Sequence, residues 1–103
     1  MANEIIRGTT PTITYTFKSV KVSDIEVAYF TIKQAGEILV EKTLDDATVG
    51  DGVLSWELTQ EDTLGLNLGN AEPMVNWRLT SGLRGASRKA SIGIIDNHKN
   101  EVI

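Results

Sequence analysis

The chain contains no cysteine among its 103 residues, so it has neither a disulfide nor a thiolate ligand for a metal. It also lacks any uninterrupted apolar run near the ~18 residues of a membrane-spanning helix, and we therefore expect no membrane partner. The opening residues Met1–Glu4 form neither a basic nor an apolar segment. We therefore expect no signal peptide and synthesis in the cytoplasm.

Histidine is almost absent as well, since His98 is the only one. A Ser-His-Asp triad or a histidine-bound metal would depend on this residue. Its neighbours Asp96, Asn97, Lys99 and Asn100 are all polar, which is typical of a solvated turn. No Gly-rich loop runs into a lysine and a helix, so a nucleotide-binding motif is missing too. We predict a non-catalytic protein with no cofactor, no metal site and no small-molecule substrate.

What the sequence does contain fits a single globular domain spanning residues 1–103, with 41% hydrophobic and 23% charged residues. The net charge of −4 is concentrated in residues 34–63, where eight acidic side chains face Lys42 alone. Such a surface argues against nucleic-acid binding, which needs basic residues. The acidic segment is either a solvated face or a patch complementary to a partner or a neighbouring copy. Its acidic residues are Glu37, Glu41, Asp45, Asp46, Asp51, Glu57, Glu61 and Asp62.

Short runs that alternate apolar and polar residues dominate the pattern and predict β-strands. The clearest run is 12–18, which places Ile13, Tyr15 and Phe17 on one face and threonines on the other. About seven to eight short strands with turns every 8–12 residues are typical of an antiparallel β-sandwich or small barrel. The other predicted strands are 26–33, 37–43, 53–58, 74–80 and 87–95, with a short first strand at Glu4–Arg7 and a fragment at Glu101–Ile103.

The same alternation predicts which side chains are buried. Ile38 and Val40 are expected to share one face of their strand. Trp56 and Trp77 are expected on inward faces, where packing in the core is favoured over stacking on a ligand. Further inward rows are predicted for Ala28, Phe30 and Ile32, for Leu54 and Leu58, for Val75 and Leu79, and for Ala90, Ile92 and Ile94.

Residues 59–66 depart from the strand pattern. Thr59 followed by Asp62 is typical of a helix N-cap, and Gly65 is expected to end the helix early. We predict one or two helical turns near 60–66 that bridge the two sheets, with Leu64 in the core.

One loop contains three aspartates, Asp45, Asp46 and Asp51, and is a candidate for a hard cation such as calcium. Its spacing differs from that of the Asp-x-Asp-x-Asp-Gly calcium loop. Turns also use aspartate routinely, so both interpretations stay open.

A second polar connection contains three cationic residues, Arg84, Arg88 and Lys89. They are candidates for contact with a phosphate or an acidic partner, or they simply face solvent. No aromatic residues are interleaved with them to stack nucleic-acid bases.

Four segments stand in a distinctive order along the chain: Arg7–Thr9, Thr14–Phe17, Ala28–Lys33 and Leu58–Thr63. In this order they resemble the N-terminal domain of phage baseplate upper proteins and related small proteins encoded in prophages of low-GC Gram-positive bacteria. The resemblance extends from Arg7 to about Ile95. It implies an immunoglobulin-like β-sandwich that acts as a virion assembly module in a tail, baseplate, neck or capsid.

In the baseplate proteins this domain precedes a linker, a helical stalk and a receptor-facing region, whereas the present sequence ends at Ile103. This difference from the baseplate proteins favours an accessory role in the virion. Expected partners are other virion proteins or further copies of the chain, through Glu4–Arg7 and Glu101–Ile103 or through the acidic segment. The alternative is a carbohydrate- or surface-binding module.

Overall fold

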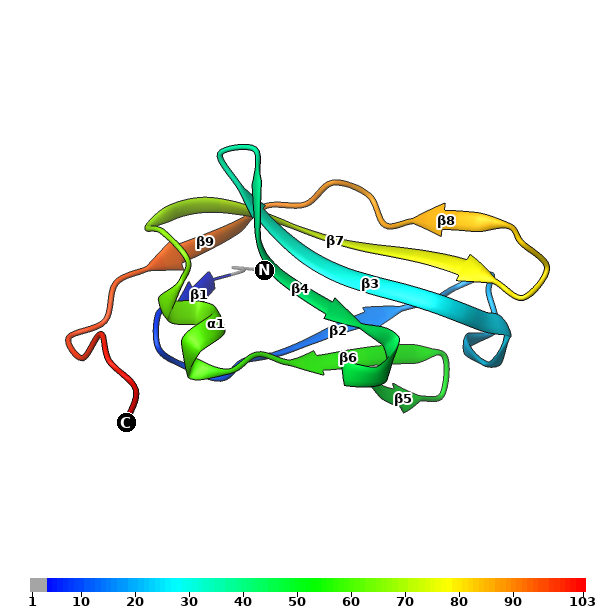
Figure 1. Cartoon of the computed structure of the whole chain (residues 1–103), viewed down its shortest axis with the longest axis horizontal. Coiled ribbons are helices and arrows are strands. Elements are labelled where there is room, and N and C mark those ends of the chain that lie inside the picture. The colour runs from blue at the N-terminus through cyan, green and yellow to red at the C-terminus, as the bar shows by residue number, and fades with distance from the viewer. Residues whose placement is uncertain (1–3) are drawn as a thin grey trace.

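The computed structural model describes residues 4–103, which form two β-sheets packed face to face (Figure 1). The larger sheet has the order β1-β9-β7-β3-β4, with β8 paired to β7, and the smaller sheet has the order β2-β6-β5. The β-sandwich predicted from the sequence is confirmed. The strands are β1 (Glu4–Ile6), β2 (Thr12–Thr16), β3 (Ile25–Gln34), β4 (Glu37–Thr43), β5 (Thr48–Gly50), β6 (Val53–Glu57), β7 (Gly69–Leu79), β8 (Arg84–Ala86) and β9 (Ile92–Ile95). The helical elements are α1 (Gln60–Leu64) and the 3₁₀ turns η1 (Val22–Asp24) and η2 (Leu44–Asp46).

The strand count and one strand direction differ from the prediction. The described residues form nine strands, because β5 and β8 lie in segments that we expected to be loops. The sheets are also not wholly antiparallel, since β1 pairs with β9 in parallel, with Glu4 opposite Gly93 and Ile6 opposite Ile95. Almost the whole chain connects these two strands, so its length permits either direction.

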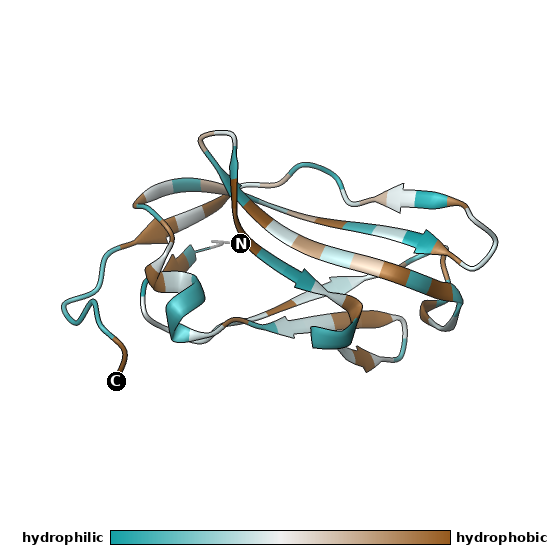
Figure 2. Ribbon diagram, viewed as in Figure 1, coloured by the Kyte–Doolittle hydropathy of each residue, from teal (hydrophilic) through white to brown (hydrophobic). Residues whose placement is uncertain are grey.

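The core lies between the sheets and centres on Trp56 of β6, which is 0% exposed. Its ring stacks on Phe30 of β3, with centroids 5.4 Å apart and planes inclined by 21°. Its indole N–H also donates a hydrogen bond of 2.9 Å to the carbonyl of Thr43 at the end of β4. Buried and more exposed residues alternate along β3 from Ala28 to Gln34, and the strand shows bands of different hydropathy (Figure 2). The rows Ala28, Phe30 and Ile32 and Leu54, Trp56 and Leu58 are all buried, as expected.

A β-bulge overturns the predicted face of β4. Val40 pairs with Ile32 and is 2% exposed, but the register shifts so that Ile38 pairs with Lys33. The extra residue in β4 is Leu39, and it moves Ile38 to the outside, where it is 53% exposed. Periodicity cannot reveal an inserted residue, so Ile38 and Val40 do not share a face.

The short helix α1 begins as predicted. The Thr59 hydroxyl accepts a hydrogen bond from the Asp62 N–H, and the Asp62 carboxylate accepts one from the Thr59 N–H, which makes a capping box. Gly65 is the C-cap. The helix connects β6 in the smaller sheet with β7 in the larger one, so the predicted bridge between the sheets is confirmed.

The buried residue of α1 is Thr63, whereas the predicted core residue Leu64 is half-buried. The Thr63 hydroxyl accepts a 2.9 Å hydrogen bond from the Gly8 N–H and donates one of 2.8 Å to the Thr9 carbonyl. Arg7 donates to the Leu64 carbonyl at 2.8 Å. A polar clamp therefore joins the loop after β1 to the helix, and this is why a threonine occupies the buried position.

The carboxyl-terminal fragment predicted as a strand is not one. Residues 101–103 are exposed and lie outside the sheets. Ile103 instead contacts the side chain of Gln60 through two hydrogen bonds, one in each direction, of 2.7 and 3.0 Å.

Replacing the central aromatic residue is expected to destabilise the fold strongly. Trp56→Ala should lower the free energy of unfolding by ~3–5 kcal/mol, because it leaves a cavity against Phe30 and removes the bond to Thr43. Tyr29→Ala is the matched control, since Tyr29 is an exposed aromatic residue of the same sandwich. Denaturant melts should show a loss below about 1 kcal/mol for the control. Similar losses in both variants would contradict this account of the core.

The capping carboxylate makes part of the stability depend on pH. Burial alone would raise the pKa of Asp62, but hydrogen bonds from Lys42, at 2.7 Å, and from Thr59 outweigh it and hold the pKa below the ordinary 3.8. The ionised form is therefore favoured in the folded state, so its contribution is present above the unfolded pKa and disappears as the pH falls through the folded one.

We expect Asp62→Asn to lower the unfolding free energy by about 1 kcal/mol at pH 7. The difference from the unmodified chain should shrink steadily below about pH 5, as the carboxylate becomes protonated. Urea melts between pH 7 and pH 2.5 measure it. A difference that stays constant over this range would show that the charge of Asp62 does not stabilise the fold.

Candidate binding groove along the edge of the smaller sheet

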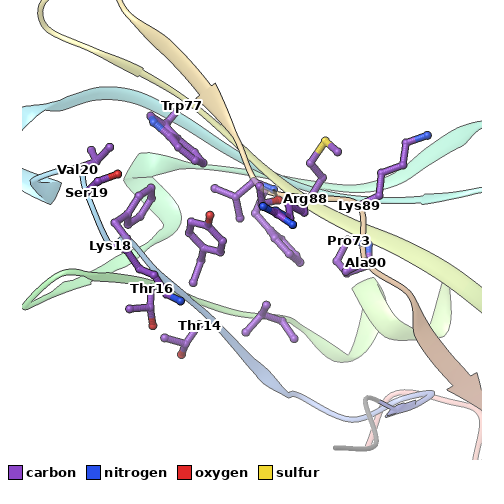
Figure 3. A pocket seen from close by; sticks show the side chains of 17 residues that line it. Thr14, Thr16, Lys18, Ser19, Val20, Pro73, Trp77, Arg88, Lys89 and Ala90 are labelled. Carbon is purple, nitrogen blue, oxygen red and sulfur yellow. Dashed lines mark hydrogen bonds between the residues drawn. The ribbon is translucent and has the colours of Figure 1, made fainter.

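An open groove follows β2, which is an edge strand because it pairs only with β6. The groove has a volume of about 660 Å³ and separates β2 from the chain segment that follows β8 (Figure 3). Consecutive residues Ile13–Val20 line one wall, and Ser87–Ala90 with part of β7 line the other. The sandwich is therefore open along this side.

The free edge of β2 offers backbone hydrogen-bonding groups to another chain. Phe17 donates to the Gly52 carbonyl, and the Pro11 carbonyl accepts from Leu58. Because successive residues of a strand direct their backbone N–H and C=O groups to opposite sides, every second residue from 11 to 17 directs these groups toward β6. The N–H and C=O groups of Thr12, Thr14 and Thr16 consequently point outward. The strand contains no charged residue and no proline to protect this edge.

Three aromatic side chains in contact with one another are part of the apolar lining of the groove. Phe17 packs edge to face on both Tyr15 and Trp77, with ring centroids 4.8 and 5.0 Å apart. Trp77 is half-buried here and is not a full core residue like Trp56. Its indole lies over Gly85, its partner in the β7–β8 ladder, where a Cβ would come within 2.5 Å of the ring. The absence of a side chain at Gly85 thus leaves the space that the Trp77 ring occupies.

The rim of the groove is basic. Lys18 extends β2, and Arg88 and Lys89 lie across the groove from Thr14 and Thr16 (Figure 3). None of these three cations forms an ion pair within residues 4–103. Arg84, which lies near Arg88 and Lys89 in the sequence, is on β8 and lines a separate hollow. The structure therefore separates Arg84 from the other two and brings Lys18 to them.

The segment opposite β2 is held by Ser87. Its N–H donates 2.8 Å to the Val75 carbonyl, and its hydroxyl accepts 2.9 Å from the Val75 N–H. This side-chain bond replaces a backbone bond, so the chain leaves the ladder and the predicted strand 87–95 is reduced to Ile92–Ile95. Ala90, predicted to be buried, is exposed and lines the groove instead.

The other candidate residues do not form a site. Asp46 accepts a hydrogen bond from the Thr43 N–H at 2.8 Å and caps η2, while Asp45 and Asp51 are exposed. Over the range that the structure describes, no three His, Cys, Asp or Glu side chains are grouped to hold a metal ion. His98 is exposed in the turn after β9.

The sequence did not predict the groove, because the groove lies beside a strand edge that the smaller sheet leaves unpaired. The alternating run 12–18 predicted the strand and its inward face, but not that it lies at an edge. The uncharged Thr-Ile-Thr-Tyr-Thr run was the available signal, since exposed edges usually carry a protective charge or proline.

Replacing Gly85 tests how the groove is built. Gly85→Ala should displace the Trp77 ring and cost roughly 1–3 kcal/mol of stability, because the new Cβ overlaps the indole. Near-ultraviolet circular dichroism should change with it. Gly65→Ala is the control, since its Cβ meets only ordinary contacts at 3.5 Å. An unchanged spectrum in Gly85→Ala would show that Trp77 is not held by this contact.

Comparison with known proteins adds no relative. No protein-family model matches the chain, and no curated protein is similar enough to count as a match. Among residues 4–103, none of the helices has the length and apolar character to cross a membrane.

Proposed function

We propose that the chain is a non-catalytic structural protein of a bacteriophage or prophage, an accessory component of the tail, baseplate, neck or capsid that acts through protein–protein contacts. The observation that carries the proposal is the free β2 edge, which lies beside an apolar groove with a basic rim. A bare strand edge bordered by a groove is the usual site for adding a strand from another chain.

The chemistry of the groove supports a polypeptide as the bound partner. The outward backbone groups of Thr12, Thr14 and Thr16 match those of an extended strand, which gives affinity without a particular sequence. The aromatic row then accepts alternate side chains of that strand, and Lys18, Arg88 and Lys89 select acidic neighbours. These features suit repeated docking in an assembly.

The link to a virion comes from the four segments that, in their order along the chain, resemble baseplate upper proteins. Two of these segments meet in the fold, because Gly8 and Thr9 hydrogen-bond to Thr63. A contact between distant segments gives a physical reason for them to occur together. The proposed location is the virion, after synthesis in the host cytoplasm.

A carbohydrate- or surface-binding module is the second candidate, and the aromatic lining of the groove favours it. Sugar binding by stacking needs an aromatic ring with a free face. Here Phe17 packs edge to face on both Tyr15 and Trp77, which ties the three rings to one another. The arrangement suits packing against side chains of a strand better than stacking on a sugar.

The proposed function is tested in the strain that carries the gene. Particles are induced, purified on a density gradient and analysed by mass spectrometry, with a deletion strain as the control. We expect the chain in stoichiometric amounts in the particles, and incomplete or non-infectious particles after deletion. Flanking genes for a terminase, portal or tape-measure protein would agree with this result.

Absence of the chain from purified particles, together with neighbouring genes for polysaccharide use, would overturn the proposal. A glycan array then tests the second candidate. Binding that is lost in Trp77→Ala would favour the carbohydrate-binding module.

A further inference from the structure

The geometry points to head-to-tail pairing between copies of this chain, in which the β5 edge of one copy adds to the β2 edge of the next. The inference deepens the proposed function and rests on it for its biological setting, since it names the partner at the groove. Its physical basis is the opposite charge of the two edges of one three-stranded sheet.

The two edges of the smaller sheet carry charge of opposite sign. The β2 edge has the basic rim described above. At the other edge, β5 lies between Asp45 and Asp51, and Glu41 of the neighbouring β4 is exposed nearby in the chain. Neither Asp45 nor Asp51 forms an ion pair within the described range. Each edge therefore presents unpaired charge that the other can neutralise.

Strand direction allows this pairing to repeat. Both β2 and β5 run antiparallel to β6, so they run parallel to each other. A rotation about an axis along the strands keeps that direction and places β5 of one copy beside β2 of the next. The carboxyl ends of the two strands then meet, which brings Asp51 to Lys18.

Apolar contact supports the same arrangement. Val49, the middle residue of β5, pairs with Leu54 and so belongs to the inner face of the sheet. It is nevertheless 61% exposed, because no strand covers the outer side of β5. Beside β2 of the next copy, Val49 would extend the inward row formed by Ile13 and Tyr15. The exposed valine thus gains the cover that its own chain does not provide.

Charge also disfavours the symmetric alternatives. A two-fold β2–β2 pair would bring two basic rims to one interface, and a β5–β5 pair would bring two acidic edges together. Only the β5–β2 pair joins unlike charges. Such a contact is heterologous, and it closes into a ring or continues as a filament.

The experiment uses two charge-reversed variants of the full chain. Lys18→Glu with Arg88→Glu makes both edges acidic, and Asp45→Lys with Asp51→Lys makes both edges basic. None of the four side chains forms a hydrogen bond within residues 4–103, so the variants should fold. Sedimentation velocity over a range of concentrations measures association.

We expect the unmodified chain to self-associate, about tenfold more weakly in 0.5 M salt than in 0.05 M salt. Each variant alone should remain monomeric, and an equimolar mixture of the two should recover association, because unlike edges again meet. A mixture that stays monomeric while the unmodified chain associates would overturn the pairing of these edges. A monomeric unmodified chain at all concentrations would overturn self-pairing altogether.

A third variant tests the backbone contact. Thr14→Pro removes an outward N–H without breaking a bond to β6, whereas Thr14→Val keeps that N–H and also loses the hydroxyl bond to Ser55. Association should be lost in the proline variant and kept in the valine variant. Equal behaviour of the two would show that the β2 edge does not donate to a neighbour.

The two proposals fail in different ways. A chain found in purified particles but monomeric in solution retains the virion role and loses the self-pairing. A chain that associates through these edges but is absent from particles retains the pairing and loses the virion role.

Discussion

The stacking of Trp56 on Phe30 is the contact on which the two sheets depend. It joins β6 of the smaller sheet to β3 of the larger one, and the indole bond to Thr43 adds the end of β4. Because η2 follows Thr43 and leads into β5, these interactions close the sandwich on the side of β4 and β5. On the opposite side Phe17 and Tyr15 pack on Trp77 of β7, but there the groove remains open beside β2.

The two sides of the sandwich therefore have different roles: one stabilises the fold, and the other is available for contact with a partner. The side of β4 and β5 contains the Trp56–Phe30 stack and the bond to Thr43. The groove side contains the half-buried rings of Tyr15 and Trp77 and three cations that form no ion pair in the described range. Trp77 marks the boundary, since it packs on Phe17 and is placed by Gly85. A strand from a second copy would cover the surface beside β2 that the chain leaves exposed. Docking of that copy would therefore also close the open side of the sandwich.

Alternation in the sequence predicted the β-sandwich and the inward rows around Phe30 and Trp56. The Thr59–Asp62 spacing separately predicted the helix N-cap, and each of these features depends on residues close together in the chain. Alternation did not reveal every face. It was wrong about Ile38, since a bulge at Leu39 changes the face without changing the composition. The parallel β1–β9 pair and the free β2 edge depend on sheet order. The local pattern of residues does not encode that order. The sequence therefore did not predict that Lys18 lies at the candidate site.

Amide hydrogen exchange of β2, followed by nuclear magnetic resonance, tests the central claim most directly. In dilute solution the amides of Thr12, Thr14 and Thr16 should exchange quickly, while those of Ile13, Tyr15 and Phe17, which face β6, should be protected. At high concentration the three threonine amides should become protected as neighbouring copies add to the edge. Protection of these amides in the dilute monomer, or rapid exchange at every concentration, would contradict a free edge that pairs with another copy.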